Sequence, residues 1–422
     1  MIRHDRLFGA AVRDRRASIC VHLWLSVACL CLAPWSTILG TEEPSVVTPP
    51  PGARDIFAQF ANVLETLQKH YVDPSRLQAA PPVAVALREF VRSLDAEADL
   101  LTPEEAVAAG APLPAGICDF GVSLTISNDY PTVISARDGG AAQRAGLFTG
   151  DQIIAIDGQT TKHARLFDVN NRLRSPASSK VTLRALDTAG TEREFVVERT
   201  AQSAQGIARL KFLGQRIAYY RLAEFKLAAV EILQDETKRA QARRAHALIL
   251  DLRNNAGGTF DAAMVAARLF LPAKAEIVSL EYSRPQFRTT FVSDQADKVT
   301  IPMLLLVNGG TAGEAEIFAA ALRDNKRARL VGSRTFGRGY LFSRFTLPDG
   351  SALSIPTAQY LPPSGHPFQG TGLTPDIVVD LPRETERALA VAGFGSFDRM
   401  NNGSKVLKID AALARALELL AR

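Results

Sequence analysis

The stretch Pro302–Lys326, PMLLLVNGGTAGEAEIFAAALRDNK, has the pattern of a buried strand that turns sharply into a helix. The apolar run Met303–Val307 predicts the strand, and Asn308-Gly309-Gly310 predicts the turn. Thr311 and Glu314 have the spacing of a capping box, so we expect a helix to begin there. A helix N-terminus at the end of a strand is a favourable place for a nucleophile or an anion.

Two motifs in this part of the chain have the same spacing as a pair of motifs in a known family. Gly310–Ile317 is GTAGEAEI, and Arg334–Phe342 is RTFGRGYLF. They resemble G-[ST]-A-S-A-S-E-I and R-T-F-G-K-G-x-x-Q of the carboxy-terminal processing peptidases, also called tail-specific proteases. These are serine endopeptidases in which the first Ser after the Ala is the nucleophile, the Lys is the general base and the Gln orients the base.

The resemblance places Gly313 at the nucleophile position, Arg338 at the base position and Phe342 at the orienting position. Gly313 has no side chain that could attack a carbonyl. Arg338 stays protonated at any useful pH, so it cannot accept a proton as a buried Lys can. Phe342 offers no hydrogen bond. We therefore predict that the site cannot perform the family chemistry; Thr311 and Ser333 are the alternative nucleophiles, but neither has a Lys or His at a motif position.

A glycine-rich turn follows the predicted buried strand Ala247–Leu252. The family pattern here is D-L-R-N-N-P-G-G, and this chain has DLRNNAGG, with Ala256 in place of the Pro. The resemblance implies that Gly257 and Gly258 form an oxyanion loop. The same glycines also suit a tight turn that is needed only for packing, and both roles are compatible.

Short strands separated by turns occupy residues 118–200, in an order that resembles a bacterial protease PDZ domain. The most specific signature is RAGLFTGDQIIAIDG at residues 144–158. The carboxylate-binding loop of such domains, G-[IL]-G-[IFL], corresponds to Gly121-Val122-Ser123-Leu124. Its backbone N–H groups would hold the terminal carboxylate of a protein tail added as a strand. Ser123 replaces a Gly and restricts the backbone, so a domain that only packs on the core is the alternative.

Residues 1–40 have the composition of an export signal. Its first 16 residues contain five Arg, and Ala17–Gly40 contains no Asp, Glu, Lys or Arg. We predict cleavage after Gly40 and a periplasmic or cell-envelope protein. The alternative is an uncleaved anchor formed by residues 17–40, which would associate the chain with a membrane. Three of the four Cys lie in the leader. Cys118 is the one that remains in the mature chain, so we expect no internal disulfide there.

Charge and histidine spacing exclude several function classes. The formal net charge of the 422-residue chain is +5, and the leader, with five Arg and two Asp, carries +3 of it. The remainder is nearly neutral, so no nucleic-acid partner is expected. The six His are scattered without metal-ligand spacing, and no nucleotide-binding motif is present. We therefore expect neither a metal nor a cofactor.

The expected fold is an α/β and α+β multidomain protein with helices before the PDZ domain and an α/β core after it. Apolar periodicity predicts helices near residues 56–71 and 83–94, and Thr102 predicts the capped start of a third. In sequence order the expected parts are the leader 1–40, a linker 41–53, a helical region 54–115, the PDZ domain 118–200, a tail-specific-protease-like core 205–385, and an extension 386–422 with an amphipathic helix.

The family's L-D-P-H-S-x-Y-L segment is degraded in this chain to LDAEADLL at residues 94–101. Three functions fit the whole pattern. The first is an exported pseudopeptidase whose PDZ domain binds protein C-termini or unfolded polypeptide, as a scaffold or as a regulator of an active paralogue. The second is an active serine-type endopeptidase with a non-standard nucleophile. The third is a purely structural envelope protein. A serine-reactive probe separates the first two, and a C-terminal peptide array separates the first from the third.

Overall fold

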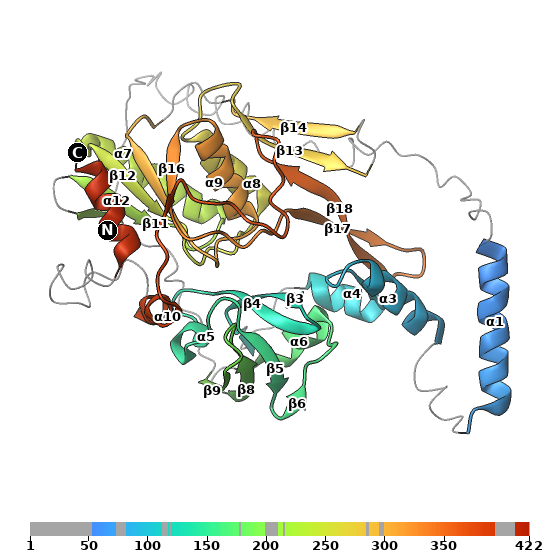
Figure 1. Cartoon of the computed structure of the whole chain (residues 1–422). Coiled ribbons are helices and arrows are strands. Elements are labelled where there is room, and N and C mark those ends of the chain that lie inside the picture. The colour runs from blue at the N-terminus through green and yellow to red at the C-terminus, as the bar shows by residue number, and fades with distance from the viewer. Residues whose placement is uncertain are drawn as a thin grey trace, which may run out of the picture. The chain divides into compact units, whose positions relative to one another are not determined.

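The computed structural model describes residues 53–72, 82–111, 117–118, 120–176, 179–198, 210–213, 216–283, 287–294, 299–392 and 410–421. They belong to two compact units, one that ends at Pro82 and one that runs from Val83 to Arg422. In the first unit the predicted helix is confirmed as α1 (Ala53–His70), shown in blue in Figure 1. No helix of the described ranges is both long and apolar enough to cross a bilayer, and residues 1–40 lie outside those ranges.

The second unit begins with α3 (Pro82–Leu94), β1 (Asp99–Leu101) and α4 (Pro103–Gly110). The predicted cap of the third helix is confirmed. The Thr102 hydroxyl accepts a hydrogen bond from the Glu105 N–H at 3.2 Å, and the Glu105 carboxylate accepts one from the Thr102 N–H at 3.0 Å. β1 pairs antiparallel with β18 (Ala352–Leu361), so this segment forms part of a sheet of the core.

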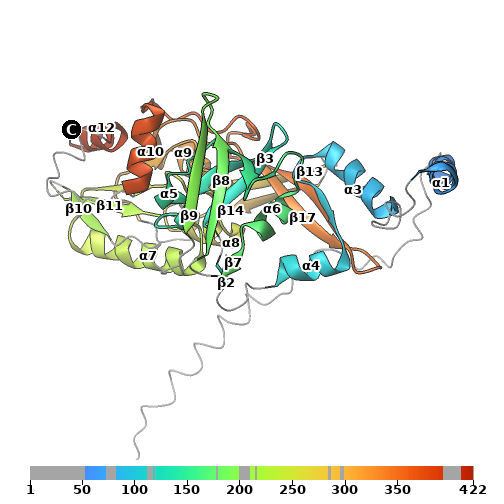
Figure 2. The same cartoon turned by 90° about the horizontal axis from the view of Figure 1, so that it is seen from below.

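The predicted PDZ domain has a sheet with strand order β3-β4-β5-β8-β9, and β6 pairs with β5. β3, which contains most of the predicted carboxylate-binding loop, lies at the end of that order. Alternating residues such as Val133, Ile153 and Leu183 are fully buried and form the apolar core of the domain. Figure 2 shows β8 and β9 in the foreground. The elements of the domain are β2 (Ile117–Cys118), β3 (Val122–Ser127), β4 (Tyr130–Ala136), α5 (Ala141–Ala145), β5 (Gln152–Ile156), β6 (Gln159–Thr160), α6 (Leu166–Arg172), β7 (Ser175–Pro176), β8 (Lys180–Leu186) and β9 (Glu192–Glu198).

The core is built on a sheet with strand order β10-β11-β12-β15-β16-β19, parallel except where β10 pairs with β11. Long apolar runs such as Met303–Val307 form its strands because both faces are covered. The elements are β10 (Lys211–Leu213), β11 (Ile217–Arg221), α7 (Leu227–Ala242), β12 (Ala247–Asp251), α8 (Phe260–Arg268), β15 (Met303–Val307), α9 (Glu314–Asp324), β16 (Ala328–Gly332) and β19 (Ile377–Val378). A second sheet joins β1, β18, β13 (Glu276–Tyr282) and β14 (Arg288–Val292), and β17 (Tyr340–Thr346) pairs with β18.

Successive residues of the parallel strands face opposite layers. Leu250 and Leu305 pack among the residues of α7, α8 and α9, whereas Ile249 and Leu304 pack toward α12 (Ala411–Leu420). The predicted C-terminal amphipathic helix is confirmed over these residues, and α10 (Arg383–Ala392) precedes it. Figure 1 shows α8 and α9 side by side against the sheet. The loops that follow β12 and β15 lie at the carboxyl ends of these strands, where an α/β fold places its sites.

Candidate functional site

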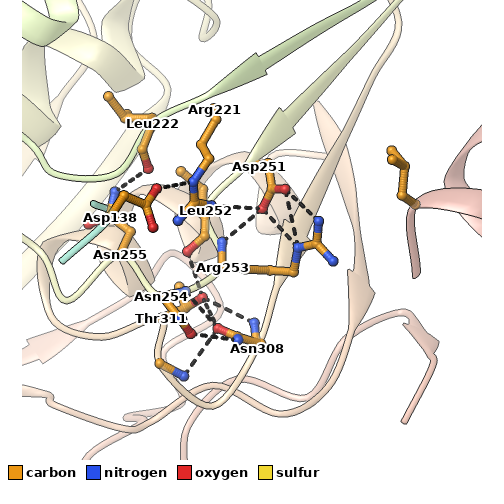
Figure 3. A network of polar contacts seen from close by, with 12 residues as sticks. Asp138, Arg221, Leu222, Asp251, Leu252, Arg253, Asn254, Asn255, Asn308 and Thr311 are labelled. Carbon is orange, nitrogen blue, oxygen red and sulfur yellow. Dashed lines mark hydrogen bonds and ion pairs between the residues drawn. The ribbon is translucent and has the colours of Figure 1, made fainter. Parts of the chain in front are cut away.

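The site begins where two neighbouring parallel strands end. β12 pairs with β15, and the loops after them interlock through two asparagines. The Asn254 N–H donates to Asn308 Oδ1 at 2.8 Å, and Asn308 Nδ2 donates to Asn254 Oδ1 at 2.8 Å (Figure 3). Farther along, the Ala312 N–H donates to the Asn255 carbonyl at 2.9 Å. The oxyanion-loop motif and the nucleophile motif are therefore held against each other by buried hydrogen bonds.

The predicted capping box at Thr311 and Glu314 is wrong. The N-cap of α9 is Gly313, whose N–H donates to the Glu316 carboxylate at 3.0 Å. Thr311 is fully buried, and its hydroxyl donates to the Leu252 carbonyl at 2.8 Å instead. The chain enters the helix later than predicted because Gly313 takes a φ of 58°, a left-handed conformation that glycine adopts readily.

Glu316 joins the two halves of the site. Its fully buried carboxylate accepts hydrogen bonds from the N–H groups of Gly337 at 2.7 Å and Arg338 at 2.8 Å, in addition to Gly313 and the Thr335 hydroxyl. Burial raises the pKa of Glu316 to about 7, against the opposite effect of these four donors. One carboxylate thus fixes the distance between the nucleophile position and the base position.

The structure brings the three substituted positions together. Gly313, Arg338 and Phe342 line one cavity of about 300 Å³. A Cβ added to Gly313 would have no closer neighbour than the Ala256 carbonyl oxygen at 3.6 Å, so the nucleophile position is open. The other lining residues are Ala256, Gly258, Glu314, Tyr340, Leu341 and Tyr360.

Arg338 is held by a residue that the sequence did not indicate as part of the site. Its Nη2 lies 2.8 Å from Oε2 of Glu97, and the other oxygen of Glu97 accepts a hydrogen bond from the Thr125 hydroxyl on β3. Glu97 lies in the segment that replaces the family's L-D-P-H-S-x-Y-L. The departure from that pattern is the sequence feature that could have pointed to Glu97. The base position is therefore occupied by a cation with its own counter-ion.

Gly258 of the predicted oxyanion loop lines the same cavity, but its N–H already donates a hydrogen bond to another side chain. The Gly258 N–H donates to Glu314 Oε2 at 3.0 Å, while the Gly257 N–H donates to Asn255 Oδ1 at 2.9 Å. A Cβ on Gly258 would lie 2.1 Å from the Phe225 carbonyl oxygen, so this glycine is also required for packing. Burial raises the pKa of Glu314, whereas its hydrogen bonds and Arg338 lower it.

The predicted peptide-binding loop of the PDZ domain faces the core. Gly121 and Ser123 line a second cavity, of about 150 Å³, together with Gly257 and Gly258. Val122 is partly buried, and Leu124 packs in the PDZ core. The predicted carboxylate-binding loop and the predicted oxyanion loop therefore line one cavity.

Buried polar contacts fix the PDZ domain to the core. Arg221, on β11, pairs with Asp138 of the PDZ domain and lies 3.4 Å from Asp251 Oδ1 (Figure 3). Nearby, the Ser135 hydroxyl donates to the Asn254 carbonyl at 2.5 Å. On another side of the domain, Asp151 pairs with Arg383 of α10 at 2.7 Å. Sequence patterns gave no signal for these pairs, because the partners are far apart in the chain.

The same ionic cluster anchors the C-terminal helix. The buried Arg253 side chain lies between Asp251, at 2.6 Å, and Asp410, at 2.8 Å. Asp410 is also the N-cap of α12, since its carboxylate accepts from the Leu413 N–H at 3.0 Å. Within the described ranges no group of three His, Cys, Asp or Glu side chains could hold a metal ion.

Comparisons with known proteins find relatives of both the core and the domain that precedes it. The profile of peptidase family S41 matches residues 216–379, and a PDZ domain profile matches residues 132–186. The chain is 34% identical to a carboxyl-terminal-processing protease of Synechocystis sp., over 70% of this chain and 71% of that one. It is 30% identical to a carboxy-terminal-processing protease of Bartonella bacilliformis, over 77% and 75%. The solved photosystem II D1 C-terminal processing protease superposes with a TM-score of 0.65 at 26% identity, over 80% of this chain and 97% of that one.

Proposed function

Since this chain belongs to peptidase family S41, among its carboxyl-terminal-processing proteases, we propose that it is a proteolytically inactive member that binds protein C-termini. The observation that carries the proposal is the cavity at the end of β15. In it the nucleophile position is Gly313, and the base position is an arginine paired with Glu97 at 2.8 Å. Neither residue can do what a serine and a neutral lysine do in acyl transfer.

The second part of the proposal is that the PDZ domain supplies the binding function. β3 lies at the end of its sheet, which is where a bound tail adds as a strand. Gly121 keeps a φ of 69°, which the turn before β3 requires. The partner class is a protein C-terminus or an unfolded polypeptide, and the protein acts as an exported scaffold or as a regulator of an active paralogue in the cell envelope.

A non-standard nucleophile is not favoured by the contacts of the two alternative residues. The Thr311 hydroxyl lies fully buried between the Leu252 carbonyl and the Asn308 N–H, so it faces no substrate. Ser333 follows β16, and the cavity around Gly313 is lined by other residues.

The first prediction concerns tail binding. A fluorescent peptide with an apolar C-terminus should bind the purified full-length chain at least tenfold more tightly with a free carboxylate than with a terminal amide. The reason is that charge-assisted hydrogen bonds to the loop contribute about 1.5–3 kcal/mol. Gly121→Val should weaken this binding at least tenfold, because a β-branched residue cannot adopt a φ of 69° without strain. Fluorescence anisotropy measures both effects.

Gly190→Val is the matched control, because Gly190 has a φ of 84° in the turn between β8 and β9 and lies outside the loop. It should leave the peptide affinity unchanged. Equal affinity for acid and amide, or no binding of either peptide, would contradict tail recognition and favour a purely structural role.

A further inference from the structure

The Glu314 side chain contacts both glycines of the predicted oxyanion loop. Its Oε2 accepts the Gly258 N–H at 3.0 Å, and an added Cβ on Gly257 would lie only 2.2 Å from the same oxygen. Glu314 directly follows Gly313, so the carboxylate reaches the loop from the first residue of α9. The family pattern has Ala at this position, and an Ala side chain has no oxygen that could accept this hydrogen bond.

We propose that the Glu314 carboxylate is an internal ligand of the oxyanion loop. The free carboxylate of a peptide tail can displace it and accept the hydrogen bond from the Gly258 N–H instead. The proposal rests on the proposed function only for the choice of a peptide as the ligand. The site itself is defined by the Gly258 N–H, by the missing Cβ of Gly257 and by the adjoining cavity of about 300 Å³.

The chemistry of this place suits a carboxylate more than another group. A backbone N–H that already binds one carboxylate oxygen would bind another in the same geometry. Gly313 leaves open space beside it, and Tyr340, Phe342 and Tyr360 give the cavity an aromatic wall for the chain that carries the carboxylate. Arg338 adds little attraction, because Glu97 neutralises it.

The hydration of the two carboxylates keeps the exchange close to balance. Burial of the carboxylate raises its pKa, and the Gly258 hydrogen bond offsets only part of that effect. An incoming carboxylate that replaces Glu314 would let this side chain return to water. The exchange therefore recovers hydration for one carboxylate while it removes hydration from another.

The test compares the full-length chain with Glu314→Ala, using N-acetyl-leucine and its amide as probes. Calorimetry should show that Glu314→Ala binds N-acetyl-leucine at least tenfold more tightly than the unaltered chain does, and that neither protein binds the amide comparably. In protein labelled with ¹⁵N-glycine, the Gly258 amide resonance should shift on addition of the acid. Glu314→Gln, which keeps an oxygen acceptor and the same shape, should behave like the unaltered chain.

Two further variants locate the binding. Glu231→Ala removes an exposed carboxylate of α7 and should change nothing. Gly121→Val in the Glu314→Ala background should retain the new binding, so a failure of PDZ tail recognition would not be mistaken for a failure of this proposal. Glu314→Ser is measured in parallel, in case Glu314→Ala does not fold. Equal affinity of Glu314→Ala and the unaltered chain for the acid, or a Gly258 resonance that stays in place, would overturn the proposal.

Discussion

Peptide cleavage should appear in a chain that carries Gly313→Ser, Glu314→Ala, Arg338→Lys, Phe342→Gln and Glu97→Gln, whereas the unaltered chain should show none. The first, third and fourth changes restore the nucleophile, the base and its orienting residue in a frame that Glu316 holds together. Residues that act as a catalytic unit are far from additive, so no single change should give activity. The assay is cleavage of an unfolded protein with an apolar tail, followed by mass spectrometry.

The structure explains why the two remaining changes are needed. Glu314 occupies the Gly258 N–H, and one oxyanion donor contributes about 10²–10³ in kcat. Glu97 lies 2.8 Å from the Arg338 guanidinium, so it would hold the proton on a lysine at that position. Without Glu97→Gln we expect activity only at alkaline pH, and with it the pH–rate profile should shift toward neutral pH.

The matched control replaces Gly313→Ser by Gly313→Ala in the same background. Both residues bear the strain of a φ of 58°, but only the serine supplies an oxygen. If the five-substituted chain melts like the control and still cleaves nothing, then the cleft has lost more than its catalytic side chains. The glycine motifs would then serve packing alone.

Glu316→Ala should lower the free energy of unfolding by about 4 kcal/mol at pH 5. The change leaves the N–H groups of Gly313, Gly337 and Arg338 and the Thr335 hydroxyl without their shared acceptor in a buried place. Urea unfolding followed by circular dichroism measures the loss. Glu231→Ala, on the exposed face of α7, should change the free energy of unfolding by less than about 0.5 kcal/mol.

The pH dependence of that difference tests the state of the carboxyl. The pKa of Glu316 is about 7 in the folded chain and 4.5 when unperturbed, so the folded chain binds the proton more tightly. Its contribution to stability is therefore complete below pH 4.5 and falls as the pH rises through 7. The difference between the unaltered chain and Glu316→Ala should narrow by up to about 3 kcal/mol between pH 5 and pH 8. A constant or widening difference would contradict a raised pKa.

Local patterns predicted the elements of this fold well, because the forces that set those elements are local. The cap at Thr102 and the strand Met303–Val307 were identified from side-chain chemistry and apolar runs alone. The spacing of two motifs also predicted that Gly313, Arg338 and Phe342 would share one site, and they line one cavity. A motif carries tertiary information that periodicity does not.

The errors and omissions have a common physical origin. The predicted start of α9 is wrong because the spacing of Thr311 and Glu314 fits a capping box. In the folded chain the Thr311 hydroxyl donates to the Leu252 carbonyl instead. Glu97 and Arg338 are 241 residues apart, and the pairing of β18 with both β1 and β17 brings them together. Contacts of this kind cannot be predicted from one sequence.

The most direct test of the central claim is labelling of the unaltered full-length chain with a fluorophosphonate probe, read by intact mass and peptide mapping. The five-substituted chain serves as the positive control, and the chain with Gly313→Ala in the same background serves as the blank. We predict no adduct within residues 302–345 of the unaltered chain and no cleavage of an apolar-tailed protein above the blank. An adduct on Thr311, Ser333 or any other residue of that region, accompanied by cleavage, would contradict the account and show an active peptidase.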